Sequence, residues 1–139
     1  MVHALEKVHR LLAPGGWLID IHPTEQPPAL EVRRGERVTL AGWVHETDDY
    51  IEYAQASEAL EAVRQRGLYD LEDARTFDFL THAGSLSELL DHLSQEWKDA
   101  FSDERTAGKV EELLLSAEPD REVRIREAVN IARLRARRG

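Results

Sequence analysis

Cysteine is absent from this chain of 139 residues. The absence excludes a disulfide framework, a thiolate metal site and a cysteine nucleophile. Long apolar runs are also missing, because none approaches the roughly 20 residues that a helix needs to span a bilayer. Near the start, Glu6, Lys7 and Arg10 interrupt the leucines where a secretory signal would have an apolar core. We therefore expect a cytoplasmic protein with no membrane-spanning segment.

Basic side chains are in the minority, with 18 Lys and Arg against 27 Asp and Glu, and the net charge is −9. Such a charge repels a phosphate backbone, so we expect no nucleic-acid partner. The arginines near the C-terminal end have no interleaved aromatic residues for base stacking. We interpret them as cations on the solvated face of a helix rather than as a nucleic-acid-binding tail. They are Arg121, Arg124, Arg126, Arg133, Arg135, Arg137 and Arg138.

A short helix that stops at a Pro-Gly-Gly turn and continues into an apolar strand organises residues 5–23. Leucine and valine recur at three- and four-residue steps over 5–12, as on one face of a helix. Pro14 cannot continue the helix, and Gly15 can take the positive φ that the third position of a type II turn requires. The alternating residues of 17–22 then predict a strand that is covered on both faces at its start.

Turn residues and changes of hydrophobic period divide the rest of the sequence into further elements. Thr47 or Asp48 is available as the N-cap of a helix, and a capping box begins at Ser85. We assign Phe77 and Phe79 to the core face of their strand. The expected elements are a hairpin over 30–44, a helix over 50–63, a strand over 75–82, and helices over 86–97, 110–117 and 120–134.

The order of these elements predicts an α/β or α+β fold. We expect a small mixed, largely antiparallel sheet of about four strands with helices packed on it. The length and the composition, 42% hydrophobic and 32% charged, are ordinary for one globular domain. We therefore treat residues 1–139 as a single domain, in which residues 85–138 form a helical C-terminal part.

A family resemblance rests on Glu6, His9-Arg10-Leu11-Leu12, Pro14-Gly15-Gly16 and Asp20-Ile21-His22-Pro23. This pattern resembles the second half of class I S-adenosylmethionine-dependent methyltransferases, where a helix ending in LLxPGG leads into the fifth strand of the sheet. The resemblance implies a methyltransferase-like protein, with a fold like the second half of that domain.

The family binds its cofactor at a glycine-rich turn after the first strand, and no G-x-G occurs in this sequence. No cofactor-binding residue can therefore be carried over. We expect the lone chain to bind no cofactor and to be catalytically silent, and to bind S-adenosylmethionine only if an N-terminal half completes it. The alternative is a homodimeric module that reuses this half-fold to bind a small molecule or another protein.

The resemblance also implies where a substrate would lie, because the carboxyl end of the strand over 17–22 opens onto the substrate side of the family's crevice. Asp20 and His22 lie two apart on that strand, so the carboxylate can orient the imidazole as a general base. The alternative is a strand-end pair that is only solvated or bonded to backbone. His45 and Tyr50 are further candidates for lining the crevice.

Three histidines, His22, His45 and His82, fall near the ends of predicted strands. Catalytic zinc sites use three imidazoles, but strand ends at opposite edges of a sheet do not converge on one ion. No HxH or HExxH spacing is present either. We expect no metal site.

A strand that has lost its neighbour exposes backbone groups that recruit other chains. In the family, the strand over 17–22 has such a neighbour in the missing half. We therefore expect a two-fold homodimer, or a separate chain that carries the cofactor half. The partner would cover this strand edge or the helix face formed by Leu86, Leu89, Leu93 and Trp97.

Overall fold

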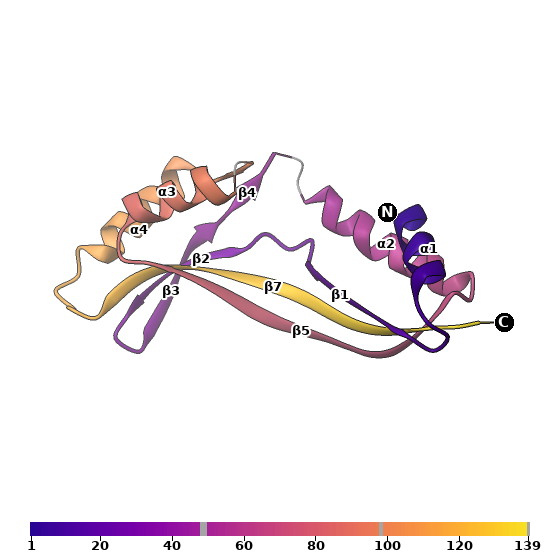
Figure 1. Ribbon diagram of the computed structural model, residues 1–139. Coiled ribbons are helices and arrows are strands. Elements are labelled where there is room, and N and C mark those ends of the chain that lie inside the picture. Colours follow the sequence, from indigo (N-terminus) through magenta and orange to yellow (C-terminus); the bar gives the residue numbers. More distant parts are fainter. Residues whose placement is uncertain (48–49, 98, 139) are drawn as a thin grey trace. The chain divides into compact units, whose positions relative to one another are not determined.

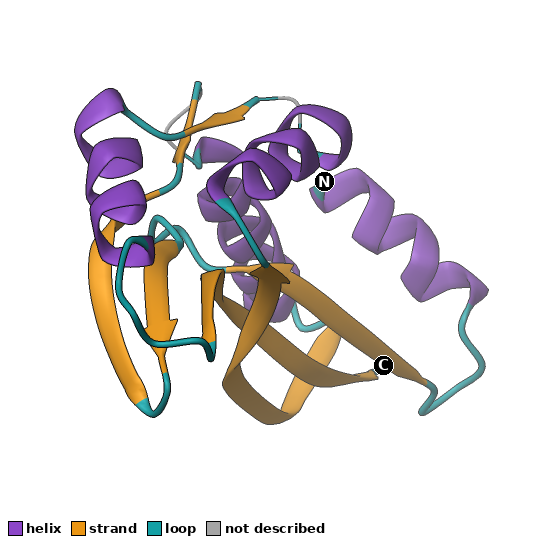
Figure 2. Cartoon of the chain, turned by 90° about the vertical axis from the view of Figure 1, so that its left-hand side faces the viewer, coloured by secondary structure: helices purple, strands orange, loops and turns teal. Residues whose placement is uncertain are grey.

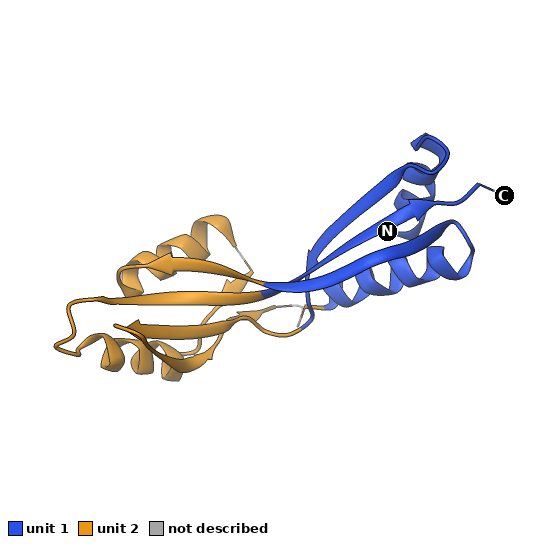
Figure 3. Ribbon diagram, turned by 90° about the horizontal axis from the view of Figure 1, so that it is seen from below, with its two compact units in different colours: residues 1–25, 51–77, 128–139 blue, residues 26–50, 78–127 orange. Residues whose placement is uncertain are grey.

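The structure is a computed structural model that describes residues 1–47, 50–97 and 99–138. Asp48, one of the two expected N-caps, lies outside the described residues. The chain divides into two compact units, coloured separately in Figure 3. The first unit comprises Met1–Glu25, Ile51–Phe77 and Ala128–Gly139, and the second comprises Gln26–Tyr50 and Asp78–Glu127.

The main sheet has five strands, and its longest strand, β7, pairs with three of the others. β1 and β2 lie antiparallel to different stretches of β7, β3 pairs with β2, and β5 pairs with β7. The expected combination of helices with an antiparallel sheet is confirmed. The strands of this sheet are β1 (Trp17–Pro23), β2 (Ala29–Arg34), β3 (Arg37–Trp43), β5 (Tyr69–Ala83) and β7 (Arg121–Ala136).

Four helices and one small sheet complete the described elements (Figure 1). The small sheet pairs two strands of two residues each, which no sequence pattern indicated. Its strands are β4 (His45–Glu46) and β6 (Ala100–Phe101), and the helices are α1 (Val2–Leu11), α2 (Ile51–Gln65), α3 (Leu86–Glu96) and α4 (Glu104–Leu114).

The expected last helix over 120–134 is wrong, since these residues form strand β7. The apolar residues of this segment fit a helical period and a period of two, so their spacing does not distinguish a helix from a strand. β-Branched residues such as Val123, Ile125, Val129 and Ile131 favour a strand. Partners on both edges of β7 then decide the outcome. The sheet consequently has one more strand than expected, and residues 85–138 are only partly helical.

The arginines of β7 are correspondingly not cations on a helix face. Arg133 and Arg135 both pair with Glu72 of β5, and Arg126 pairs with Asp78. The acidic residues of neighbouring strands therefore neutralise this basic segment.

The Pro-Gly-Gly turn forms as expected. α1 ends at Leu11, and the Gly16 N–H donates to the carbonyl of Ala13 at 2.8 Å. Gly15 has a φ of +70°, which an L-residue rarely adopts. The turn delivers the chain into β1, where residues 17–23 pair with 129–135 of β7.

In the first unit, both helices pack together and α2 packs on β1. The Tyr69 hydroxyl donates to the Leu5 carbonyl at 2.9 Å, and the His9 ring packs edge-on against Tyr69. These contacts anchor α1 on the start of β5. The buried apolar residues are Leu5, Ala59, Leu60, Val63, Tyr69, Leu134 and Ala136.

The other face of β1 is open, contrary to the expectation of a strand covered on both faces. Trp17, Ile19 and Ile21 are 54%, 52% and 58% exposed. The expectation for Phe77 and Phe79 is also wrong, since both rings are more than 40% exposed. In β1, the helices of the first unit cover only one side of the strand, whereas residues 70–79 of β5 are exposed on both sides.

In the second unit, α4 packs on the β2–β3 hairpin and α3 packs beside α4 (Figure 2). The capping box at Ser85 is confirmed, because its hydroxyl accepts the Glu88 N–H. Leu89 and Leu93 are buried in the core of this unit. The helix face of Leu86, Leu89, Leu93 and Trp97, which we expected a partner chain to cover, is thus partly covered by the chain itself.

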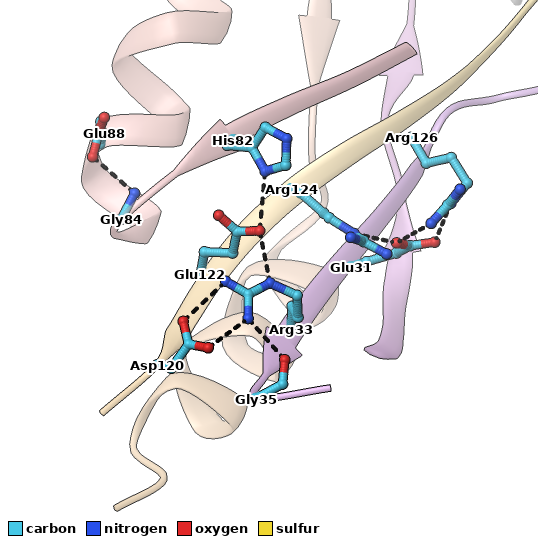
Figure 4. Close-up of polar contacts among 10 residues, drawn as sticks. All are labelled: Glu31, Arg33, Gly35, His82, Gly84, Glu88, Asp120, Glu122, Arg124 and Arg126. Carbon is cyan, nitrogen blue, oxygen red and sulfur yellow. Dashed lines mark hydrogen bonds and ion pairs between the residues drawn. The ribbon is translucent and has the colours of Figure 1, made fainter. Parts of the chain in front are cut away.

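Two networks of ion pairs link β2 to β7 in the second unit (Figure 4). In the first, Glu31 accepts from Arg124 at 2.8 Å and from Arg126 at 2.9 Å. In the second, Arg33 donates to Glu122 and to Asp120, the first residue of the segment that was expected to be helical. Hydrogen bonding and charge attraction from Arg33 lower the pKa of Asp120. These networks hold the basic strand against its neighbour.

Candidate functional site

The candidate site begins with the alternation of β1. Leu18 packs against the core of the first unit, and Asp20 and His22 share its face of the strand because they lie two and four residues further on. On β7, Ala132 lies opposite Asp20, and Asn130 lies opposite His22. The fold therefore turns Asp20 and His22 toward the helix-covered side of the sheet.

A chain of three polar side chains connects β1 to α2. The Nδ1 atom of His22 lies 2.5 Å from Oδ2 of Asp20. Its Nε2 atom lies 3.0 Å from the hydroxyl of Ser57. Both the Asp20 and the His22 side chains are only 12% exposed. The structure thus brings the two predicted residues together and adds a third.

This arrangement assigns a role to each imidazole nitrogen. A carboxylate can only accept, so the neutral imidazole of His22 carries its proton on Nδ1 and donates it to Asp20. Nε2 then presents a lone pair to the Ser57 hydroxyl. A histidine held in this way can take a proton from a hydroxyl at Nε2, while the carboxylate stabilises the resulting imidazolium.

The three side chains open into a cavity of about 370 Å³ within the first unit. This size lies within the range of small-molecule sites. Its wall is largely apolar, and two arginines reach it. Arg64 also pairs with Glu61, and Arg75 pairs with Asp73. The apolar lining comes from Leu60, Leu71, Ala74, Ile131, Ala132 and Leu134.

Asn130 and Thr76 supply further polar groups to the same cavity. The Thr76 hydroxyl donates to Oδ1 of Asn130 at 2.9 Å. This bond fixes the amide so that its Nδ2 group remains a donor. Asn130 lies directly opposite His22 in the β1–β7 register, so its side chain and the imidazole are cross-strand neighbours on the same face of the sheet.

Ser57 and Asn130 were not recognised as site residues from the sequence. Ser57 lies in the predicted helix over 50–63, three residues before Leu60, and so falls within the apolar stripe of that helix. A hydroxyl within such a stripe is the one signal that could have indicated a polar partner on the strand below. Asn130 was assigned to a helix, where it would not have faced β1.

The other two sequence candidates, His45 and Tyr50, belong to the second unit. His45 Nε2 lies 3.7 Å from Oδ2 of Asp103, and its ring packs against Phe101. The Tyr50 hydroxyl donates to the Val44 carbonyl at 2.6 Å. His45 also lines a cavity of about 770 Å³ beside α4. The structure therefore groups His45 with α4 and β6 instead of with Asp20 and His22.

Within the described residues, no helix is long and apolar enough to cross a membrane. In the same part of the chain, no group of three or more His, Asp or Glu side chains could hold a metal ion. No family model, curated protein or solved structure matches this chain.

Proposed function

We propose that this chain is the acceptor-binding half of a cytoplasmic methyltransferase-like protein of the class I, S-adenosylmethionine-dependent kind. One observation carries the proposal. The helix, the Pro-Gly-Gly turn and β1 together place the Asp20–His22 pair in a cavity at the carboxyl end of the strand. That is the end at which open α/β sheets bind their ligands.

The connection between β1 and β5 supports this architecture. β1 is antiparallel to β7. Along β5, Asp70 pairs with Arg137 just after β7, Glu72 pairs with Arg133, and Thr76 bonds to Asn130, so β5 is antiparallel to β7 as well. β1 and β5 are therefore parallel to each other, and β2, β3, β4 and α2 lie between them in the sequence. Parallel strands need a long connection of this kind, and here it includes the helix α2.

The cofactor itself does not fit the residues of this chain. A cofactor turn follows a strand and opens a helix. The glycines with positive φ, at 15, 35 and 67, each lead into a strand instead. We therefore assign to the chain only the acceptor side of the reaction: holding a small acceptor in the cavity and taking its proton at Nε2 of His22.

The exposed face of β1 supports a partner in the working protein. Trp17, Ile19 and Ile21 form an apolar row, and the guanidinium groups of Arg133 and Arg135 lie 5.4 and 5.2 Å from the Trp17 ring. A separate chain with the cofactor half would cover this row and supply the missing turn. A second copy of the chain would instead make a homodimeric binding module, which is the second candidate function.

Titration calorimetry with S-adenosylmethionine, combined with light scattering, tests the proposal. We expect the coding DNA upstream of residue 1 to encode, in frame or in an adjacent gene, a strand followed by a G-x-G turn. The lone chain should give no heat of binding, and addition or fusion of that segment should restore binding. In the restored protein, His22→Gln should lower methyl transfer about 10²- to 10⁴-fold, and His92→Gln should leave it unchanged.

Two results would overturn the proposal. One is the absence of any such upstream segment together with a stable dimer of the lone chain, which would favour the homodimeric module. The other is restored cofactor binding with transfer that is insensitive to His22→Gln, which would remove the assigned base.

A further inference from the structure

We propose that Ser57 is a nucleophile and that Asp20, His22 and Ser57 form an acyl-transfer site that takes small activated esters. This activity is distinct from methyl transfer and does not depend on the proposed function, because every group that it needs lies in the chain itself. The inference rests on the geometry of three side chains and on the cavity that they share.

The first step is the match between the observed geometry and the requirements of a serine nucleophile. A nucleophile and its base must lie within about 2.6–3.2 Å, and a third group must orient the base. The Ser57 hydroxyl lies 3.0 Å from Nε2 of His22, and Asp20 lies 2.5 Å from Nδ1. Such triads are recognised by geometry and not by order along the chain.

Regular structure holds all three groups in place. Asp20 and His22 come from β1, and Ser57 comes from the second turn of α2, beside the buried residues Ala56 and Leu60. Sites on helices and strands hold their geometry more tightly than sites on loops. Hydrogen bonding at both ring nitrogens also fixes the orientation of the imidazole.

A tetrahedral intermediate needs a hydrogen-bond donor for its oxyanion. The backbone N–H of Ser57 lies within a helix and serves the helix ladder, so the donor must be a side chain. Asn130 is placed for this role. It lies opposite His22 in the sheet, lines the cavity, and keeps its Nδ2 group as a donor because Thr76 occupies its Oδ1.

The cavity defines the class of substrate. Its volume of about 370 Å³ and the apolar side chains of Leu60, Leu71 and Ile131 suit a short acyl chain. We therefore assign short-chain esters with a good leaving group, such as a phenolate, because one side-chain donor stabilises the intermediate less than a full oxyanion hole would.

The reaction balances without any further reagent except water. Oγ of Ser57 bonds to the ester carbonyl carbon while its proton moves to Nε2 of His22. The carbon–oxygen bond to the leaving group then breaks, and the leaving group departs as a phenol with the proton from Nε2. Water, deprotonated in turn by His22, releases the carboxylic acid and regenerates the serine.

The test uses the full chain with p-nitrophenyl butyrate and a fluorophosphonate probe, followed by peptide mass spectrometry. We expect release of p-nitrophenol and probe attachment at Ser57. Ser57→Ala should abolish attachment, and Ser57→Ala and His22→Gln should each lower the ester rate at least about 10²-fold. Ser94→Ala is the matched control, since Ser94 is an exposed helical serine whose hydroxyl donates to the Asp91 carbonyl.

Ser57→Ala should fold normally, because alanine is the better helix former, and circular dichroism would verify this. Asn130→Ala should lower the ester rate, while Ser57 should still be labelled by the probe to the same final extent after long incubation. Attachment at a residue other than Ser57, or an ester rate that survives Ser57→Ala, would overturn the inference. So would a folded wild-type chain that releases p-nitrophenol no faster than free imidazole at the same concentration.

Discussion

Replacing Glu31 by glutamine is expected to lower the free energy of unfolding by about 3–5 kcal/mol, the usual cost of removing one partner from a buried ion pair. Glu31 is 8% exposed and Arg124 is 9% exposed. Arg126 keeps a second carboxylate, Asp78, at 2.7 Å. Arg124 has no other ion pair in the described part of the chain, so the substitution leaves its charge buried and uncompensated. Urea unfolding measures the difference.

Glu61→Gln is the matched control for this experiment. Glu61 pairs with Arg64 at 2.7 Å, but both side chains are exposed, so the loss should be below about 1 kcal/mol. A double change of Glu31 and Arg124 to leucine and methionine should recover much of the loss, because apolar residues can replace a buried pair. Equal losses for Glu31→Gln and Glu61→Gln would contradict the assigned role.

The same ion pair makes a pH dependence predictable. Burial of Glu31 opposes its ionisation, but hydrogen bonds from Arg126 and Arg124 outweigh that effect, and the pKa of Glu31 is lowered. A lowered pKa contributes stability that is complete above the unfolded value of about 4.3 and is lost as the pH falls through the folded value. As the pH falls through the folded pKa of Glu31, the difference in the free energy of unfolding between the wild-type protein and Glu31→Gln should therefore become smaller.

Gly42→Ala is expected to destabilise the second unit by about 1–3 kcal/mol, as overpacking of a filled core does. Gly42 lies in β3 beneath Thr106 of α4, which is 6% exposed. A Cβ atom at position 42 would lie 2.7 Å from Cγ2 and 3.0 Å from Cβ of Thr106, and would overlap its hydroxyl. The destabilisation would come from a steric clash with the Thr106 side chain and not from backbone strain. Thermal unfolding measures it.

Gly108→Ala supplies a control of opposite sign. Gly108 lies inside α4, and a Cβ atom there would meet nothing within 4 Å. The substitution should therefore stabilise the protein by up to about 1 kcal/mol, the ordinary gain in a helix interior. Combining Gly42→Ala with Thr106→Ala should recover part of the loss. Additive effects of these two changes would show that they do not contact each other.

Local signals in the sequence predicted the start of the fold well. The Pro-Gly-Gly turn, the helix before it and the strand after it depend on backbone rules that act within a few residues. Pro14 ends a helix in any context, and Gly15 accepts the positive φ of a type II turn in any context. Ser85 likewise capped its helix as expected, because a capping box satisfies its own backbone groups.

β7 could not be predicted in the same way, because its partners decide its conformation. Residues 121–136 contain eleven strong helix formers (Arg, Glu, Ala and Leu) against four strand formers (Val and Ile), and their charges would be solvated on a helix. In the sheet, Glu31, Asp78 and Glu72 from two other strands meet these arginines. The two acidic partners of Arg126, Asp78 and Glu31, lie 48 and 95 residues away from it along the sequence. A pattern read along one segment does not contain that information.

The site was half predictable for a related reason. Asp20 and His22 are neighbours on one strand, so their spacing alone placed them side by side. Ser57 joins them only because α2 packs over β1, and Asn130 joins them only because β7 is a strand. His45 and Tyr50 were further candidates for lining the crevice, but the structure places these two residues in the other unit.

The most direct test of the site is the protonation of the His22 ring, observed by nitrogen-15 NMR on the neutral imidazole, with His22→Gln identifying the signal. We predict a proton on Nδ1, shared in a short bond with Asp20, and an unprotonated Nε2 that accepts from Ser57. Asp20→Asn should shift the proton to Nε2, since an asparagine amide can donate to Nδ1. A proton on Nε2 in the wild-type protein, or a ring indifferent to Asp20→Asn and Ser57→Ala, would contradict the arrangement on which both proposals depend.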